Sequence, residues 1–218
     1  MYKRQVKFDK PYTVKEVLPA REGEKAKRMI LEFDLEPGES VQIKVALSTV
    51  GIEGAQSALL TESLDWDFEA VKKESQDLWR ELLSKVSVSG TKEQKTNFYT
   101  SLYHLYIQPN DIADIDGKYR GVNDSVFVSK SGTYYSTFSL WDTYRAAHPL
   151  YTILIPKRVP GMINSLLDYQ KVQGHLPVWT LWDKETYCMI ANHAVPVVVD
   201  AYLKAVSYTH LRAHETGA

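Results

Sequence analysis

The hydrophobic pattern of this chain changes its period near residue 65, and that change limits what the chain can fold into. Before this point, apolar residues alternate with polar or small ones in two runs, residues 31–35 and 41–47, with Pro37-Gly38-Glu39 between them. A period of two is typical of half-buried strands, and the Pro-Gly pair is a turn signal. We therefore predict β structure over residues 1–62, with the two runs paired as a hairpin. Because an isolated hairpin is marginally stable in water, it should belong to a larger antiparallel sheet.

Beyond residue 65 the apolar residues recur with the helical period of about 3.6. Thr91 and Gln94 then have the spacing of a capping box, and the apolar face that follows them ends at Pro109. These features predict two successive helices. The apolar stripe of the first helix consists of Phe68, Val71, Leu78 and Leu82.

The rest of the chain mixes a polar excursion with further helical patterns. Residues 110–138 are rich in Asp, Gly and Ser, and Asp116-Gly117 is typical of a turn. Helical patterns return near residues 139–147, 161–172 and 186–205. Helix pairs joined by aromatic loops indicate an α-helical toroid or solenoid.

Composition excludes several classes of function. Lys and Arg number 26 against 27 Asp and Glu, so bulk charge predicts binding to neither nucleic acid nor an anionic membrane. No apolar stretch approaches the roughly 20 residues of a membrane span, and no signal-peptide pattern follows the first residues. The single cysteine, Cys188, rules out an internal disulfide, and we expect it to be a small buried hydrophobe.

One candidate binding segment lies within residues 134–150. Trp141 offers a flat apolar face for a sugar ring, while Asp142 and Arg145 accept and donate hydrogen bonds to hydroxyl groups. The alternative is that Trp141 belongs to the core and that Asp142 pairs with Arg145 along one helix. The residues alone favour neither interpretation.

A second candidate segment, residues 174–186, places two indoles and two carboxylates on a loop that Pro and Gly keep irregular. Trp179 and Glu185 are its candidates for substrate binding. His193 follows on an apolar helix expected from Met189 to Val199, where it is either a binding group or a hydrogen-bonded core histidine.

Other catalytic signatures are missing from the sequence. There is no Gly-rich phosphate loop and no Gly-x-Ser-x-Gly elbow. His210 and His214 have the spacing of a helical metal pair, but residues 207–216 resemble translated sequencing-adapter DNA, so we assign no metal ligand there. Carbohydrate chemistry and simple binding remain as the main classes.

Seven ordered motifs are similar to signatures of glycoside hydrolase family 92. The resemblance extends over roughly residues 25–206, and a series of motifs in one order is far more specific than a single short pattern. The motifs are Asn97 to His104, Asp114 to Gly121, Ser139 to Leu150, Met162 to Leu167, Gly174 to Trp179, Glu185 to Ile190, and His193 to Tyr202.

The resemblance implies a mixed fold. Residues 1–62 are then the end of an N-terminal antiparallel β-sandwich and residues 63–90 a helical linker. Residues 91–206 begin an (α/α)6 toroid, the catalytic domain, and residues 207–218 are a non-native tail.

The resemblance also implies an activity, which is that of an exo-acting, α-1,2-mannosidase-like enzyme. Such an enzyme removes terminal mannose from N-glycans or mannan by an inverting, calcium-assisted mechanism. The full-length protein from which this chain derives is then expected to be periplasmic or extracellular. Trp141 and Asp142 match the sugar-contacting Trp-Asp segment. The catalytic acid and base are expected downstream of this chain, so the fragment alone should be inactive, and no calcium ligand is identified in it. The alternative is a non-catalytic carbohydrate-binding module.

Overall fold

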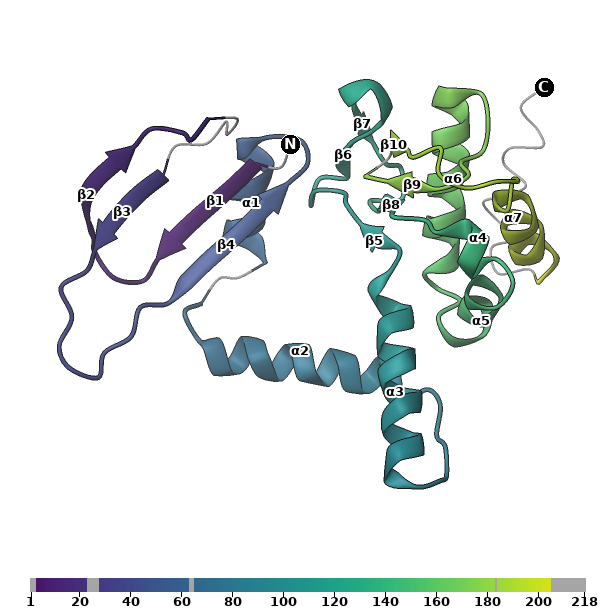
Figure 1. Ribbon diagram of the computed structural model, residues 1–218, viewed down its shortest axis with the longest axis horizontal. Helices are drawn as coiled ribbons and strands as arrows, with labels where there is room; N and C mark the ends of the chain where they lie inside the picture. The colour runs from purple at the N-terminus through teal and green to yellow at the C-terminus, as the bar shows by residue number, and fades with distance from the viewer. Residues whose placement is uncertain (1–2, 23–27, 63–64, 183, 205–218) are drawn as a thin grey trace.

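The computed structural model describes residues 3–22, 28–62, 65–182 and 184–204, and it separates into a strand region, two long helices and a helical body (Figure 1). The strand region contains β1 (Lys3–Phe8), β2 (Thr13–Leu18), β3 (Arg28–Glu32) and β4 (Ile43–Ser48). Strand β1 pairs antiparallel with β4, and β2 pairs antiparallel with β3. The two pairs lie side by side in Figure 1.

The predicted hairpin is wrong, because β3 and β4 pair with earlier strands and not with each other. Strand β3 ends at Glu32, and the next residue, Phe33, packs its ring against those of Phe8 and Tyr12 at 5.3 and 5.9 Å. This aromatic contact takes the chain out of β3 and across to the other pair. The predicted turn is present, with Gly38 at a φ of +92°.

Helix α1 (Ile52–Thr61) falls inside the stretch that was predicted to be entirely β structure. It packs against β1 and β4, and Ala55 is completely buried in that contact. Small residues, Gly54 and Ala55, bring the helix backbone close to its neighbours. Because glycine and alanine contribute little apolar surface, this segment has only a weak helical pattern, and its sequence does not predict the helix.

The two long helices agree with the prediction. Helix α2 (Phe68–Leu83) begins where the Asp67 carboxylate accepts a hydrogen bond from the N–H of Ala70 at 2.9 Å. Helix α3 (Lys92–Ile107) begins with the expected capping box, in which Thr91 and Gln94 bond reciprocally to each other's backbone.

The polar excursion is built from short strands around a small aromatic core. Tyr119 and Tyr134 stack with ring centroids 3.6 Å apart, and Ile112 packs beside them. The predicted turn closes with a hydrogen bond from the N–H of Gly117 to the carbonyl of Asp114. The elements are β5 (Asn110–Asp111), β6 (Lys118–Arg120), the 3-10 helix η1 (Val122–Asp124), β7 (Val126–Val128) and β8 (Tyr135–Ser136).

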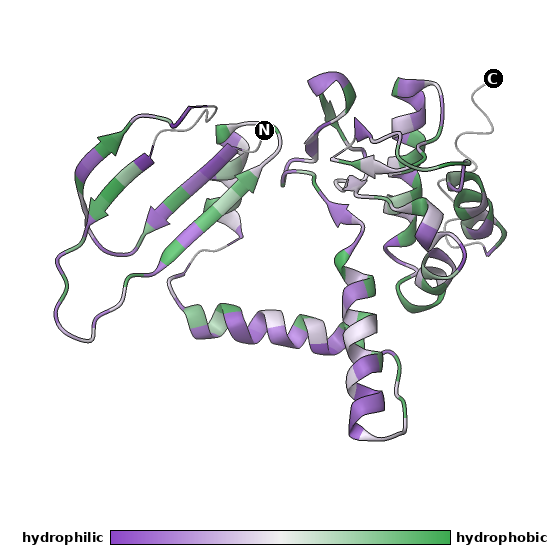
Figure 2. Ribbon diagram, in the orientation of Figure 1, coloured by the Kyte–Doolittle hydropathy of each residue, from purple (hydrophilic) through white to green (hydrophobic). Residues whose placement is uncertain are grey.

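The helical body holds the main hydrophobic core, to which α3, α5, α6 and α7 contribute most buried residues. Figure 2 shows that α5 and α7 are largely hydrophobic. No helix in the described ranges is long and apolar enough to cross a membrane. The elements are α4 (Leu140–Thr143), α5 (Ala147–Leu154), α6 (Val159–Gln173), β9 (Thr180–Leu181), β10 (Lys184–Glu185) and α7 (Ala194–Leu203).

Two expectations about the segment before α7 are corrected. The helix expected from residue 186 begins only at Ala194, so His193 is its N-cap residue and not an interior position. Residues 186–193 form a loop in which Ala191 has a φ of +65°. Cys188 lies in this loop and is exposed, whereas a buried position was predicted. The predicted histidine pair at 210 and 214 lies outside the described residues.

Candidate functional site

A chain of hydrogen bonds joins the two candidate segments. The indole N–H of Trp179 donates to Ser139 Oγ at 2.8 Å, and the Ser139 hydroxyl donates to Asp142 Oδ2 in a short hydrogen bond. The backbone holds the same two segments together, since the N–H of Thr180 donates to the carbonyl of Phe138 at 3.3 Å. The Asp142 carboxylate is therefore oriented through one oxygen, and its other oxygen makes no hydrogen bond within the described residues.

Trp141 precedes Asp142 in α4, and the residue is 38% exposed. This exposure argues against the alternative that Trp141 belongs to the core. The Arg145 guanidinium lies 5.2 Å from the centroid of the Trp141 ring and 4.9 Å from that of Tyr144. These are cation–π distances. Arg145 also donates to the Trp141 carbonyl at 3.3 Å, and within the described ranges it forms no ion pair with Asp142.

His193 joins the same cluster through ring stacking. Its imidazole lies 4.1 Å from the Tyr144 ring at an interplanar angle of 9°. Sequence reasoning named His193 but gave no role to Tyr144 or Ser139, which connect the other members. We call this set the indole cluster: Ser139, Trp141, Asp142, Tyr144, Arg145, Trp179 and His193.

Glu185 differs from the other candidates because its carboxylate faces the backbone of its own loop. It accepts hydrogen bonds from the N–H groups of Val178 at 2.7 Å, Trp179 at 3.1 Å, Thr186 at 3.0 Å and Tyr187 at 3.2 Å. Both oxygens are thus engaged by backbone donors. Glu185 holds the loop that presents Trp179, which makes it a positioning residue.

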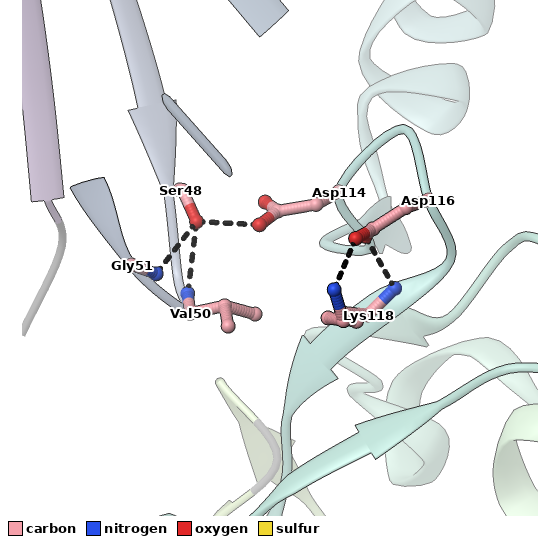
Figure 3. Close-up of polar contacts among 6 residues, drawn as sticks. All are labelled: Ser48, Val50, Gly51, Asp114, Asp116 and Lys118. Atoms are coloured by element: carbon pink, nitrogen blue, oxygen red, sulfur yellow. Dashed lines mark hydrogen bonds and ion pairs between the residues drawn. The ribbon is translucent and has the colours of Figure 1, made fainter. Parts of the chain in front are cut away.

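A polar junction ties the strand region to the excursion (Figure 3). Ser48 Oγ accepts from the N–H groups of Val50 and Gly51 at 2.9 and 3.1 Å, and it donates to Asp114 Oδ2 at 2.6 Å. Burial raises the pKa of Asp114 despite the hydrogen bond from Ser48. Nearby, Asp116 binds the ammonium group of Lys118 at 2.6 Å.

Arg120 completes this junction. Its guanidinium donates to the carbonyl oxygens of Thr49 at 2.6 Å, Val50 at 2.7 Å and Asp124 at 2.7 Å. Arg120 therefore helps to fix the link between β4 and α1 to the excursion, together with the Thr49 hydroxyl, which donates to the carbonyl of Ile112 at 3.4 Å. Sequence reasoning placed Asp114 and Arg120 in a family motif but assigned them no role, because their partners lie about 70 residues earlier in the chain.

Comparison with families of known proteins decides the classification. The chain matches the model of the glycosyl hydrolase family 92 catalytic domain over residues 54–216, which is more than half of its length. The chain belongs to glycosyl hydrolase family 92.

Solved family 92 structures are similar to the chain over nearly all of its length. A GH92 alpha-mannosidase from Bacteroides thetaiotaomicron is 31% identical with a TM-score of 0.86, over 98% of this chain and 31% of that protein. It has also been solved in complex with mannoimidazole. An inverting GH92 mannosidase from the same organism is 25% identical with a TM-score of 0.84, over 97% of this chain and 30% of that one. The chain thus spans about a third of the length of these relatives. No match was found among curated proteins.

The residues of this family 92 chain do not fit a metal centre in the part that the structure describes. No three His, Cys, Asp or Glu side chains converge there closely enough to hold an ion. Calcium favours six to eight oxygen ligands, including carboxylates. Within the described residues of the indole cluster, Asp142 is the only carboxylate, and Ser139 already binds one of its oxygens.

Proposed function

We propose that the parent protein of this chain is an exo-acting α-mannosidase that removes terminal mannose from N-glycans or mannan, and that the indole cluster contributes to sugar binding. Family membership and two solved mannosidases of the family support the reaction. The complex of one relative with mannoimidazole supports mannose-containing glycans as partners. One relative is described as inverting, and we propose that the parent also acts with inversion. From the family resemblance of the sequence motifs, we further propose that it uses calcium and is periplasmic or extracellular.

The observation that carries the binding role is the orientation of Asp142 beside an exposed indole. A sugar presents hydroxyl donors around its edge and an apolar face of C–H groups. The Asp142 oxygen left unbonded by Ser139 accepts from a hydroxyl, and the Trp141 ring contacts the apolar face. Arg145 lies over one face of the indole and also over the Tyr144 ring.

The catalytic acid and base are assigned to the part of the parent that lies beyond these residues. Inversion uses two carboxyl groups roughly 6.5 to 9.5 Å apart, one of which protonates the leaving oxygen while the other activates water. Glu185 is engaged by backbone N–H groups and Asp142 is oriented by Ser139. We therefore propose that the chain alone is inactive.

The same proposal covers the domain organisation and the metal. Residues 1–62 are assigned to the end of a β-sandwich, residues 63–90 to a linker and residues 91–206 to the start of an (α/α)6 toroid. Calcium, when bound in the parent, would polarise or orient sugar hydroxyls. We assign no calcium ligand within the described residues.

The test uses the complete gene product. Mannose release from α-1,2-linked mannobiose should occur with calcium and stop with a chelator. Failure of a well-folded parent to release mannose from any linkage would favour the binding-module alternative.

The role of Asp142 has its own test in the same protein. Asp142→Ala should weaken binding of mannoimidazole by about 10- to 150-fold, since a hydrogen bond to a charged group contributes about 1.5 to 3 kcal/mol. The matched control is Asp168→Ala, which removes a partly exposed aspartate that pairs with Lys171 on α6. Equal affinity in the two variants would exclude Asp142 from sugar binding.

A further inference from the structure

A basic pocket lies beside the first turns of α6. Its volume is about 490 Å³, and its walls come from residues 130–135 of the excursion, from residues 157–158 and from the start of α6. Three of the residues that line it are cations, Lys130, Lys157 and Arg158, and none of its lining residues in the described ranges is an Asp or a Glu. No member of the indole cluster lines it. We call it the basic pocket, a site separate from the indole cluster.

The walls of the basic pocket are held together by neutral groups. The N–H of Tyr135 donates to Ser165 Oγ at 2.8 Å, and the Ser165 hydroxyl donates to the carbonyl of Gly161 at 2.7 Å. Glycine at 161 permits this close approach, because a Cβ there would lie 2.8 Å from Thr133 Oγ1 and 2.9 Å from Tyr135 Cε2. The excursion is therefore fixed against the first turns of α6 without any use of the three cations.

The three cations have no counter-charge in the part of the chain that the structure describes. Lys130, Lys157 and Arg158 form neither an ion pair nor a side-chain hydrogen bond with the described residues. The whole chain has 26 basic and 27 acidic residues, so a pocket lined by cations alone does not follow from its composition. Because like charges around one concavity repel each other and attract anions, the arrangement favours a negatively charged ligand.

A nearby carboxylate, that of Asp111, does not neutralise the basic pocket. Asp111 is not among the lining residues, and its Oδ1 accepts from the N–H groups of Ala113 and Tyr134 at 3.1 and 2.9 Å. Burial raises the pKa of the Tyr135 phenol, the charge of Asp111 raises it further, and the charge of Arg158 opposes both. The Arg158 guanidinium therefore lies on the Tyr135 side of the pocket.

Neutral donors complete the lining. The Thr133 hydroxyl and the Asn164 amide both line the pocket. Helix α6 begins at Val159, so its first N–H groups, including that of Gly161, have no carbonyl of the same helix to bind. The helix dipole adds partial positive charge at this end. Charged side chains, a hydroxyl, an amide and backbone N–H groups thus surround one space from several directions.

The shape and size of the basic pocket favour a phosphate ester over other anions. A carboxylate presents two oxygens in one plane, whereas a phosphate monoester presents three acceptor oxygens and carries close to two negative charges above pH 7. A volume of about 490 Å³ lies within the range of small-molecule sites, which leaves room for more than a phosphate ion. Tyr135 and Pro160 provide apolar surface for the remainder of such a ligand.

We infer that the basic pocket binds the phosphate group of a small phosphate ester, with Arg158 and Lys157 on the phosphate oxygens and Tyr135 beside the alcohol moiety. Arginine suits this position because its planar guanidinium donates two parallel hydrogen bonds to an oxyanion. The inference does not depend on the mannosidase assignment.

The experiment titrates the 218-residue chain with glucose 6-phosphate at pH 8 and low salt by isothermal titration calorimetry. Inorganic phosphate and glucose are the comparison ligands. Binding of the ester should saturate, inorganic phosphate should bind more weakly, and glucose should not bind. Arg158→Gln and Lys157→Gln should each weaken binding of the ester at least about tenfold, because each removes a charged donor. The matched control is Lys72→Gln, which removes the same charge from α2 outside the pocket and should leave the affinity unchanged.

Several results would overturn the inference. Equal binding of glucose and glucose 6-phosphate would exclude a role of the phosphate group, and equal weakening in Lys72→Gln and Arg158→Gln would show that only net charge matters. Inorganic phosphate that binds as tightly as the ester would exclude an ester as the preferred ligand. Lack of saturable binding in both the 218-residue chain and the parent protein would exclude the site altogether. Because Lys157 and Arg158 are exposed, both variants should melt at the temperature of the unmodified chain, which separates lost binding from lost folding.

Discussion

Replacement of His148 should remove a defined part of the pH dependence of folding. His148 is 6% exposed on α5, with its ring 6.0 Å from that of Phe138 and 5.4 Å from that of Tyr151. Burial among these rings lowers its pKa from 6.5 to about 4, with no charged partner contributing. The folded chain therefore keeps this imidazole neutral under mildly acidic conditions.

The sign follows from proton linkage. As the pH falls through 6.5, the unfolded chain binds a proton at His148 and the folded chain does not, so the free energy of unfolding decreases until the pH reaches the folded pKa. Over the whole interval the loss is about 3.4 kcal/mol, because each pKa unit corresponds to about 1.36 kcal/mol. Between about pH 7.5 and about pH 5, the same relation gives about 2 kcal/mol.

The assay is urea unfolding of the 218-residue chain and of the His148→Phe variant at several pH values, monitored by circular dichroism. Phenylalanine keeps an aromatic ring at the site, and any packing strain that it introduces is independent of pH. The variant should therefore lose about 2 kcal/mol less than the unmodified chain over that range. His104→Gln on the exposed face of α3 is the matched control, because it removes an imidazole that is not buried. Parallel pH profiles for the chain and His148→Phe would refute the reasoning.

Three further substitutions test the contacts that position the sites. Glu185→Gln should speed hydrogen exchange of the loop amides roughly thirtyfold, or about 2 kcal/mol, because the amide group retains one acceptor oxygen for four N–H donors. Mass spectrometry of peptides spanning residues 178–187 measures this. Gly54→Ala should lower the melting temperature, since its Cβ would lie 2.0 Å from an Asp114 carboxylate oxygen; overpacking of this kind typically costs about 1 to 3 kcal/mol. Arg120→Gln should accelerate exchange in the β4–α1 link, because three carbonyl oxygens lose their shared donor. Unchanged exchange or melting would contradict the respective structural role.

Local signals in the sequence predicted the elements that depend on local physics. Helix α3 follows from a capping box whose two hydrogen bonds join residues three positions apart. Helix α2 follows from its apolar period, whereas its N-cap, Asp67, was not predicted. Trp141 and Asp142 could also be named as candidates for sugar binding from the sequence, because they are adjacent in the chain and their residue types indicate the chemistry.

Pairings between distant residues could not be predicted. Strand β4 shows its alternation clearly, but the choice of β1 as its partner depends on the ring contacts of Phe33 and on α1 packed behind the pair. Arg120 resembles any surface arginine in the sequence, and its role is set by carbonyl oxygens contributed from about 70 residues away. The sequence predicts Glu185 as a candidate for substrate binding, but a loop carboxylate does not reveal which backbone donors surround it.

The apolar stripe of α2 shows the same division between local pattern and tertiary partner. Phe68, Val71 and Leu78 lie on one face as predicted, yet Phe68 is 64% exposed and the other two are at least half exposed. At the other end of the helix, Leu82 packs against the main core. An amphipathic period therefore identifies the face that favours burial, because transfer of apolar surface from water is favourable wherever it occurs. It carries no information on which segment covers that face, so exposure has to be established from the arrangement of the elements.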